Sequence, residues 1–352
     1  MFITGVGVAQ PEQRYSQSQC WDALCASPHL GMLTPRSRAI VKKVLLGNNG
    51  IATRHLALDS LAEAFELSPD RLHERFRQNA PALATQAAQK AMAQAGLDAA
   101  EIDGIIISSC TGYLCPGLTS YVSEALGLRP DVLLLDLVGQ GCGAALPNLN
   151  AAAALVGSDR CQHVLSICVE VCSAAFYLDN DPGVLVSACL FADGAGAAVC
   201  SRAASSRSRR IEWKRFCTEL DPSSRDLLKF EQRNGMLRNI LAPEVPLLAA
   251  SAARRVLEKG LEGSAELRER ITTWIWHAGG RDVLLALLDK LQLSEQDLCW
   301  SALTLREVGN ISSPFVLHVL DRALRQGAPG GLWWMSSFGA GFSCHGALLE
   351  VE

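Results

Sequence analysis

Residues 137–150 read LVGQGCGAALPNLN, and this stretch decides the fold. The apolar residues Val132–Leu137 predict a short strand that leads into a glycine-rich turn at Gly139–Gly143. The Ala-, Leu- and Asn-rich segment Ala144–Val156 then predicts a helix. Strand, turn and helix in this order are typical of α/β proteins with buried sheets. We therefore expect the turn to lie at the carboxyl end of a strand, where α/β folds bind ligands.

The same order of elements occurs twice along the chain. In the first half a buried strand ends at Cys110, the GQGC turn follows about 32 residues later, and the segment FADGAGAAV at residues 191–199 suggests a β-hairpin. In the second half the strand ITTWIW ends at His277, the turn VGN follows about 33 residues later, and the chain closes on the hairpin SSFGAGFSCHGALLEV. Two such halves, residues 1–205 and 206–352, predict sheets packed about a pseudo-twofold axis.

Composition narrows the class of protein. The chain has 352 residues, of which 49% are hydrophobic and 19% charged, and its formal net charge is −4. This apolar content excludes a disordered chain, and without a cationic excess we expect no nucleic-acid partner. No apolar run has the length of a membrane span or the form of a signal peptide, so we expect a cytoplasmic protein with no membrane contact. The 13 cysteines are scattered and lack zinc-site spacing, so we expect no metal and a reducing compartment.

Two segments outside these motifs carry structural predictions. The Ala- and Gln-rich residues Ala82–Gly96 predict a helix that begins after Pro81. Residues 201–215, SRAASSRSRRIEWKR, show no apolar period. They form either a solvated connection between the halves or a basic arm that binds phosphate.

Cys142 is the candidate nucleophile. It lies between two glycines at the predicted start of a helix. The unpaired N–H groups and partial positive charge of a helix start favour a thiolate, and so predict a lowered pKa. The flanking glycines permit a sharp turn that exposes the sulfur. The alternative is a cysteine that merely fills the core.

His277 and Asn310 occupy the equivalent turns of the second half. Each has an ordinary alternative, because a histidine at a strand end can be held by hydrogen bonds and an asparagine can cap a helix. The duplication, however, places all three loops around one crevice. A thiolate beside His and Asn suits acyl transfer from a thioester, since both side chains can donate to an oxyanion or to the enolate of a decarboxylated malonyl thioester. An Asn in this place, instead of a carboxylate or a second Cys, favours decarboxylative Claisen condensation.

Five motifs along the chain carry a family resemblance. GQGCGAA, HAGGR, EVGNISS, SSFGAGFSC and CLFADGAGAAV resemble the thiolase-fold condensing enzymes, and most closely the type III polyketide synthases of the chalcone synthase kind. The likeness extends from about Ile3 to Glu350. Bacterial fatty-acid initiation synthases share the triad but usually carry HQAN where this chain has HAGG. Plant very-long-chain ketoacyl-CoA synthases share HAGGR and GFSC, but their membrane-spanning N-terminus is missing here.

The resemblance implies a fold and an activity. The fold would be the thiolase-like α/β/α/β/α arrangement of two duplicated βαβαβαβ halves. The activity would be that of an acyltransferase, which condenses an acyl-CoA or acyl-carrier-protein starter with malonyl-CoA through an acyl-Cys142 intermediate. Such an enzyme would need no cofactor besides its CoA thioester substrates.

The resemblance also implies roles for residues around the cavity. Phe191 would be the gatekeeper between an entry tunnel and the cavity, and Glu170 would belong to a polar network behind it. Lys42 and Lys43 would remain from a basic site for the CoA phosphates, and Cys115 would lie at a homodimer interface. The residues that would line the cavity, with the loop Ser337–Gly341 as its floor, are Cys110, Cys172, Ala175, Ser312, Gly339 and Gly341.

Two positions depart from the family pattern. Ala192 replaces the glycine that usually follows the gatekeeper and would add a methyl group to the pocket wall. Arg238, in NGMLRN, falls where the family carries a second gatekeeper Phe. Its guanidinium must face solvent, pair with a carboxylate such as Glu231 or Glu244, or bind an anionic group of the substrate. In the last case it would select an acidic or carrier-bound acyl donor.

Three functions are consistent with these features. The first is condensation with malonyl-CoA, which yields a polyketide or, after a single extension, a 3-oxoacyl product. The second is an acyltransferase or thioester hydrolase that uses Cys142 without decarboxylation. The third, a catalytically silent binding subunit, is disfavoured because all three triad residues are present.

Overall fold

A nine-stranded sheet dominates the computed structural model, which describes residues 1–352. The strands of this sheet run in the order β11-β12-β13-β8-β1-β7-β6-β4-β5, and β2–β3 and β9–β10 form two small sheets of their own. The strands are β1 (Phe2–Ala9), β2 (Arg14–Ser16), β3 (Thr53–His55), β4 (Gly104–Ser108), β5 (Leu133–Leu137), β6 (His163–Val171), β7 (Asp193–Ser201), β8 (Ile211–Leu220), β9 (Leu228–Arg233), β10 (Met236–Leu241), β11 (Ile271–Trp276), β12 (Gly331–Gly339) and β13 (Ser343–Val351).

Twelve α-helices cover and connect these strands. They are α1 (Gln17–Ala26), α2 (His29–Met32), α3 (Pro35–Leu46), α4 (Pro69–Ala95), α5 (Leu118–Leu126), α6 (Ala145–Gly157), α7 (Pro182–Leu190), α8 (Val245–Gly260), α9 (Ala265–Glu269), α10 (Arg281–Leu291), α11 (Cys299–Val308) and α12 (Phe315–Arg325). None of them combines the length and the apolar character that a membrane span requires.

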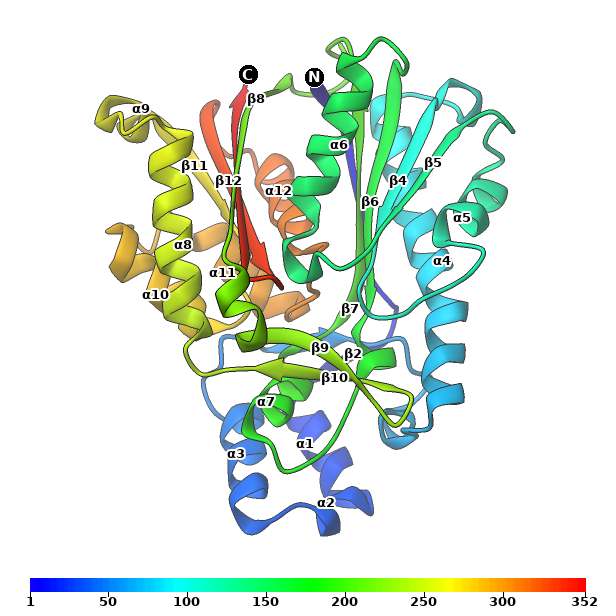
Figure 1. Cartoon of the computed structure of the whole chain (residues 1–352), viewed down its shortest axis with the longest axis vertical. Helices are drawn as coiled ribbons and strands as arrows, with labels where there is room; N and C mark the ends of the chain where they lie inside the picture. Colours follow the sequence, from blue (N-terminus) through cyan, green and yellow to red (C-terminus); the bar gives the residue numbers. More distant parts are fainter.

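The strand pairings repeat from one half of the large sheet to the other. In the order β1-β7-β6-β4 the first two pairings are antiparallel and the third is parallel, and β8-β13-β12-β11 follows the same scheme. Helices α6 and α12 lie between the two halves, α4 and α5 cover one outer face, and α8 and α10 cover the other (Figure 1). This arrangement confirms the expected α/β/α/β/α fold. The division into residues 1–205 and 206–352 stays a prediction.

Helix α6 carries the Cys142 turn into the middle of the molecule. Its sequence, ALPNLNAAAALVG, is apolar on nearly every side, as a helix packed on both faces requires. Asn148, one of the two asparagines in this helix, is completely buried and donates to Ser108 Oγ at 2.8 Å and to the Ile167 carbonyl at 2.9 Å. These bonds satisfy the buried amide and fix α6 against β4 and β6.

The helix expected at Ala82–Gly96 is longer than predicted. Helix α4 begins at Pro69, where Ser68 caps it by accepting from the Arg71 N–H, and it continues through Pro81. Small residues on α4 pack so closely on β1 that a Cβ at Gly5 or Gly7 would overlap the helix backbone. The free energy gained when α4 is buried against β1 exceeds the free energy lost with the one backbone hydrogen bond that Pro81 cannot donate.

The hairpin expected at residues 191–199 is also absent. Helix α7 ends at Leu190, and β7 is a single strand that pairs with β1 on one side and β6 on the other. Gly194 and Gly196 do not form a turn. They let β7 pack closely against its neighbours. A Cβ at Gly196 would lie 2.7 Å from Leu317 Cβ, on the central helix α12.

The Ser/Arg-rich segment at residues 201–215 connects the two halves. Its arginines bind within the chain: Arg209 stacks over Trp333 at 5.4 Å, and Arg210 pairs with Glu212 and Glu352. Because these cations are already partnered, the structure disfavours a phosphate-binding arm. The prediction of a solvated connection is wrong for residues 211–215, which begin the central strand β8 and include the buried Ile211 and Trp213.

Candidate active site

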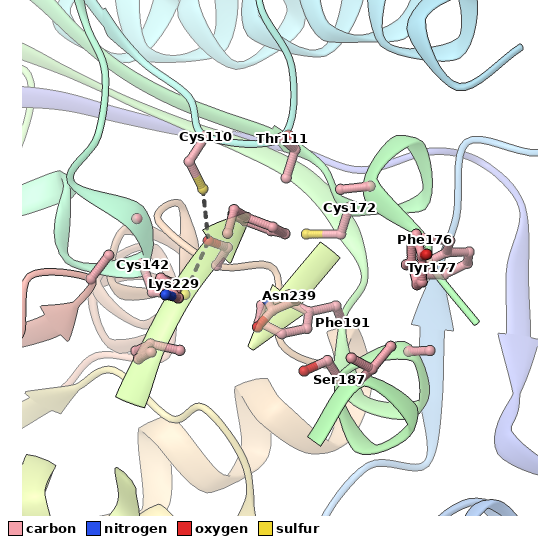
Figure 2. A pocket seen from close by; sticks show the side chains of 18 residues that line it. Cys110, Thr111, Cys142, Cys172, Phe176, Tyr177, Ser187, Phe191, Lys229 and Asn239 are labelled. Atoms are coloured by element: carbon pink, nitrogen blue, oxygen red, sulfur yellow. Dashed lines mark hydrogen bonds between the residues drawn. The ribbon is translucent and has the colours of Figure 1, made fainter. Parts of the chain in front are cut away.

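A narrow cavity of about 40 Å³ lies beside the Cys142 turn and the loop that carries Asn310 (Figure 2), and neither His277 nor Asn310 is among the residues that line it. Six of the residues singled out in the sequence line it, namely Cys110, Cys142, Cys172, Ala175, Phe191 and Ser312. Two more lining residues come from predicted loops, Gly141 from the glycine turn and Ala340 from the loop expected as the cavity floor. The lining residues that the sequence did not indicate are Thr111, Phe176, Tyr177, Val184, Ser187, Ala188, Leu228, Lys229, Phe230 and Asn239. No group of three or more His, Cys, Asp or Glu side chains is placed to hold a metal ion.

Cys142 lies in a single 3-10 turn, Gly141–Gly143, directly before α6. Gly141 has φ +55°, in the left-handed region that favours glycine. Gly143 lies against the His345 ring, and its carbonyl accepts from Ser337 Oγ at 2.9 Å. The turn is therefore held from behind by the closing β12–β13 hairpin.

Gly339 and Gly341 do not line the cavity, contrary to the expectation for the closing loop. Ala340, between them, does. A Cβ at Gly339 would lie 3.0 Å from the Cys142 amide nitrogen and overlap that of Gly143. Gly339 is thus needed for close backbone approach behind the cysteine and not for the cavity floor.

The resting state of Cys142 is a thiol. The pKa of Cys142 is raised to about 12, chiefly because the sulfur is buried. Ser312 Oγ, which donates to Cys142 Sγ at 3.1 Å, opposes this shift, and the nearby carboxyl of Glu170 adds to it. The lowered pKa expected from the helix start is therefore wrong, because removal of the sulfur from water outweighs the local dipole. Ser312 has φ +57°, rare for a non-glycine residue, and this conformation accompanies its contact with the sulfur.

His277 is buried and neutral at the end of β11. Its ring lies edge-on to Phe315 and Phe338, with centroids 5.4 and 5.2 Å away, and this apolar setting lowers its pKa to about 3. Nδ1 has no hydrogen-bond partner. Because an N–H donor is costly to leave unpaired beside aromatic rings, we assign the proton to Nε2, which faces Gly279.

Asn310 has a fixed orientation. Its Oδ1 accepts from the Ser312 N–H at 2.9 Å, and its Nδ2 donates to the Gly279 carbonyl at 3.1 Å. It does not cap α12, which begins at Phe315 without a side-chain cap. A Cβ at Gly279 would lie 3.9 Å from Asn310 Nδ2 and 4.0 Å from His277 Nε2, so both side chains lie near Gly279. Hydrogen bonds through Ser312 thus connect Cys142 to Asn310, and His277 lies near the glycine whose carbonyl Asn310 binds.

Glu170 holds the back of the cavity together. This fully buried carboxylate accepts from the Cys110 N–H at 3.0 Å, from Thr111 Oγ1 at 2.9 Å and from Ser313 Oγ at 2.7 Å. Burial raises the pKa of Glu170, while these donors oppose the shift. Cys110 Sγ also lies 3.3 Å from Glu170 Oε1, so this second cavity thiol is oriented by the network, as the family resemblance implied.

Arg238 does not line the cavity, so the hypothesis that it binds the substrate is wrong, and the alternative that it pairs with Glu231 is confirmed. Only 8% of the residue is exposed, because Nε donates to Asp179 at 2.8 Å and the other nitrogens pair with Glu231 and Asp181 at 3.0 and 3.4 Å. Side chains alternate along a strand, so Asn239, one residue further on β10, faces the cavity instead. The residue of this part of β10 that faces the cavity is thus Asn239 and not Arg238.

Replacing Arg238 with Met should lower stability by about 2 kcal/mol and leave acyl-donor preference unchanged, because the change leaves three neighbouring carboxylates without their cation. The melting temperature, compared with that of an Arg233→Met variant on the same hairpin, measures the first effect. Altered donor preference at an unchanged melting temperature would contradict this structural role.

The remaining predicted residues lie away from the cavity. Lys42 and Lys43 are exposed on α3, where Lys42 Nζ lies 5.9 Å from the Trp21 ring. Cys115 is exposed in the loop between β4 and α5. Ala192 is fully buried against Gly309 and adds no methyl group to the cavity wall, contrary to expectation.

The β9–β10 hairpin is the part of the site that the motifs did not reveal. It contributes Leu228, Lys229, Phe230 and Asn239, and the Lys229 ammonium is held by Asp226 at 2.7 Å. A local signal was available, since the Asn-Gly pair at 234–235 predicts a tight turn, and both residues have the required positive φ.

The pKa of Cys142 gives a testable pH dependence. Because the thiol pKa is raised to about 12, the thiolate fraction grows about tenfold for each pH unit below that value. Iodoacetamide should therefore modify the Cys142 peptide about tenfold faster at pH 8 than at pH 7, and Ser312→Ala should slow the reaction. Peptide mass spectrometry measures the rate, and a rate independent of pH over this interval would instead indicate an ion pair with His277.

The fold and the site together define a thiolase-fold condensing enzyme. Residues 9–217 match the family described as FAE1/Type III polyketide synthase-like protein, and residues 263–351 match the C-terminal domain of 3-oxoacyl-[acyl-carrier-protein] synthase III. The chain belongs to the type III polyketide synthase-like family. It is an acyltransferase that extends an acyl thioester by condensation with malonyl-CoA, and the enzymes of this family need no cofactor besides CoA thioesters.

Individual relatives match over nearly the whole chain. The 1,3,6,8-tetrahydroxynaphthalene synthase of Streptomyces peucetius subsp. caesius is 30% identical over 99% of this chain and 92% of its own. The 3,5-dihydroxyphenylacetyl-CoA synthase of Streptomyces toyocaensis is 27% identical over 99% of this chain and 89% of its own. The crystal structure of 1,3,6,8-tetrahydroxynaphthalene synthase from Streptomyces coelicolor A3(2) superposes with a TM-score of 0.88 at 23% identity and covers 100% of this chain and 99% of its own.

Proposed function

We propose that Cys142 carries the acyl chain during condensation. The observation that supports this most strongly is the chain of hydrogen bonds from Cys142 Sγ through Ser312 to Asn310, whose Nδ2 donates to the carbonyl of Gly279, two residues after His277. In the first step the Cys142 sulfur attacks the starter thioester, the C–S bond to CoA breaks, and the thiol proton ends on the departing CoA sulfur. Ser312 stabilises negative charge on the Cys142 sulfur, and His277 Nε2–H and Asn310 Nδ2–H donate to the oxyanion of the tetrahedral intermediate.

The same two donors serve the second step. Loss of carbon dioxide from malonyl-CoA leaves an enolate whose oxygen accepts from His277 and Asn310. The enolate carbon then attacks the acyl carbonyl, a C–C bond forms, and the bond to Cys142 Sγ breaks. A neutral imidazole suits this role, because it donates a hydrogen bond without protonating the enolate outright.

The product assay tests this function directly. Incubation with malonyl-CoA and a panel of acyl-CoA and acyl-carrier-protein starters should release products longer than the starter by two carbons per extension. Free acid of unchanged length would instead support the thioester hydrolase. The 13 free thiols favour a reducing cytoplasm as the site of this reaction, and Lys42 and Lys43 are proposed to attract the CoA phosphates.

We also propose that the enzyme is a homodimer in which a second copy covers β5. This strand forms the edge of the large sheet, and its Leu134 and Leu135 side chains are 44% and 38% exposed. Val138, which directly follows β5, is 66% exposed. Tyr113, in the loop between β4 and α5, is 71% exposed, and Cys115 in the same loop is also at the surface. An unpaired apolar edge of this kind is stabilised when another chain pairs with it.

Leu134→Asp should convert the dimer to a monomer, because two buried carboxylates would face one another across the twofold axis. Sedimentation velocity measures the change. Leu247→Asp is the matched control, since Leu247 is 71% exposed on α8, far along the sheet from β5. A wild-type enzyme that sediments as a monomer would overturn the proposed interface.

A further inference from the structure

Two polar side chains face the otherwise mostly apolar cavity without a protein partner. Ser187 on α7 and Asn239 on β10 both line the cavity and are only 4% and 9% exposed. No protein atom forms a hydrogen bond with Ser187 Oγ or with Asn239 Oδ1. Buried polar groups in folded proteins almost always have a partner, so an unpaired set inside a substrate cavity indicates a group that the substrate supplies.

The two residues come from elements that pack against each other. Helix α7 contacts β10, and Figure 2 shows Ser187 and Asn239 on the same side of the cavity as Phe191. The backbone on the α7 side is fixed, because Arg54 donates to the carbonyls of both Ala188 and Phe191, at 2.7 and 2.8 Å. Ser187 and Asn239 therefore lie on adjoining elements of the cavity wall, near Phe191.

The chemistry of the pair selects one kind of ligand group. Asn239 Oδ1 can only accept a hydrogen bond, whereas the Ser187 hydroxyl can donate one. A hydroxyl on the acyl chain satisfies both at once, because it donates to Asn239 and accepts from Ser187. An alkyl chain in the same place satisfies neither and leaves both groups desolvated.

We propose that Ser187 and Asn239 form a specificity subsite that recognises a hydroxyl group on the acyl starter. This inference rests on the proposed function. A Phe at position 239 would present only an apolar ring, so the Asn in this chain adds hydrogen bonding next to Phe191. A pantetheine amide of the CoA arm has the same donor and acceptor chemistry and is the second possible source of the polar group. The two sources are separated by comparing starters that share CoA and differ only in the acyl hydroxyl.

The test uses two matched pairs of starters, butyryl-CoA with 3-hydroxybutyryl-CoA and cinnamoyl-CoA with 4-coumaroyl-CoA. For the wild-type enzyme, kcat/KM should be about tenfold higher for the hydroxylated member of at least one pair. Ser187→Ala and Asn239→Leu should each bring this ratio close to one. Asn239→Asp keeps an acceptor oxygen in place and should retain the preference.

Ser123→Ala is the matched control, because Ser123 Oγ is also buried and unpartnered but does not line the cavity. This variant should keep the wild-type ratio. Each ratio is internal to one variant, so a partial loss of folded enzyme does not change it.

Three outcomes would overturn the assignment. Equal kcat/KM values within both pairs for the wild type would show that no acyl hydroxyl is recognised. A uniform loss for all starters in Ser187→Ala and Asn239→Leu, at an unchanged ratio, would assign the pair to the pantetheine amide. Failure of every starter to acylate Cys142 would overturn the proposed function itself, and with it this subsite.

Discussion

Cys142→Ala is expected to abolish acyl-enzyme formation and to reduce product formation about a millionfold, the scale seen when a catalytic nucleophile is removed. The twelve other cysteines cannot replace it, because only Cys142 lies directly before the N-terminus of α6 and accepts a hydrogen bond from Ser312 at its sulfur. Decarboxylation of malonyl-CoA should persist in the variant, since His277 and Asn310 remain in place. Liquid chromatography of the CoA products separates the two activities.

The other two cavity thiols provide the controls. Cys110 and Cys172 line the same cavity, and burial raises the pKa of each well above that of an ordinary thiol. Cys110→Ser and Cys172→Ser should therefore still form an acyl-enzyme. If Cys142→Ala kept measurable condensation while Cys110→Ser lost it, the nucleophile would have to be reassigned.

Asn310→Ala is expected to lower malonyl-CoA decarboxylation by two to three powers of ten, roughly the effect of removing one oxyanion donor. Acylation of Cys142 should fall less, because Ser312 and His277 still act on that step. The two rates are measured separately, as acetyl-CoA release and as adduct formation after rapid quench.

Asn310→Asp sharpens this comparison. The aspartate keeps the oxygen that accepts from the Ser312 N–H, but it replaces the Nδ2 donor with an acceptor facing the Gly279 carbonyl. It should lose decarboxylation as severely as Asn310→Ala. Equal losses of acylation and decarboxylation in both variants would mean that Asn310 acts by shaping the loop.

The order of strands and turns was predictable from the sequence, because strand ends and glycine turns are local features. The repeat of a strand end and a later glycine turn predicted that Cys142, His277 and Asn310 lie near one another. In the structure Ser312 connects Cys142 to Asn310 by hydrogen bonds, and Asn310 bonds to Gly279, two residues after His277. The closing β12–β13 hairpin also follows the sequence pattern, since two long apolar runs flank the Gly-Ala-Gly turn.

Features that depend on distant packing were not predictable in this way. Pro81 continues a helix because α4 is pressed against β1, which no local pattern near the proline reveals. The pKa of Cys142 is set by burial beneath loops far away in the sequence, so the helix start alone gave the wrong direction.

The sequence also did not show which residues of β10 face the cavity. Arg238 and Asn239 are adjacent on β10, yet one pairs with carboxylates outside the cavity and the other faces into it. A displacement of one residue in matching the family pattern exchanges the two faces of a strand. The backbone trace of the β9–β10 hairpin was needed to identify the residue beside Phe191.

Intact-protein mass spectrometry with peptide mapping is the most direct test of acyl-Cys142 chemistry. Wild-type enzyme quenched in acid after brief exposure to a starter acyl-CoA should gain the mass of one acyl group, located on the peptide that contains Cys142. Addition of malonyl-CoA before the quench should discharge this adduct as extended product appears. An adduct on another residue, or a Cys142 adduct that malonyl-CoA leaves in place, would contradict the mechanism.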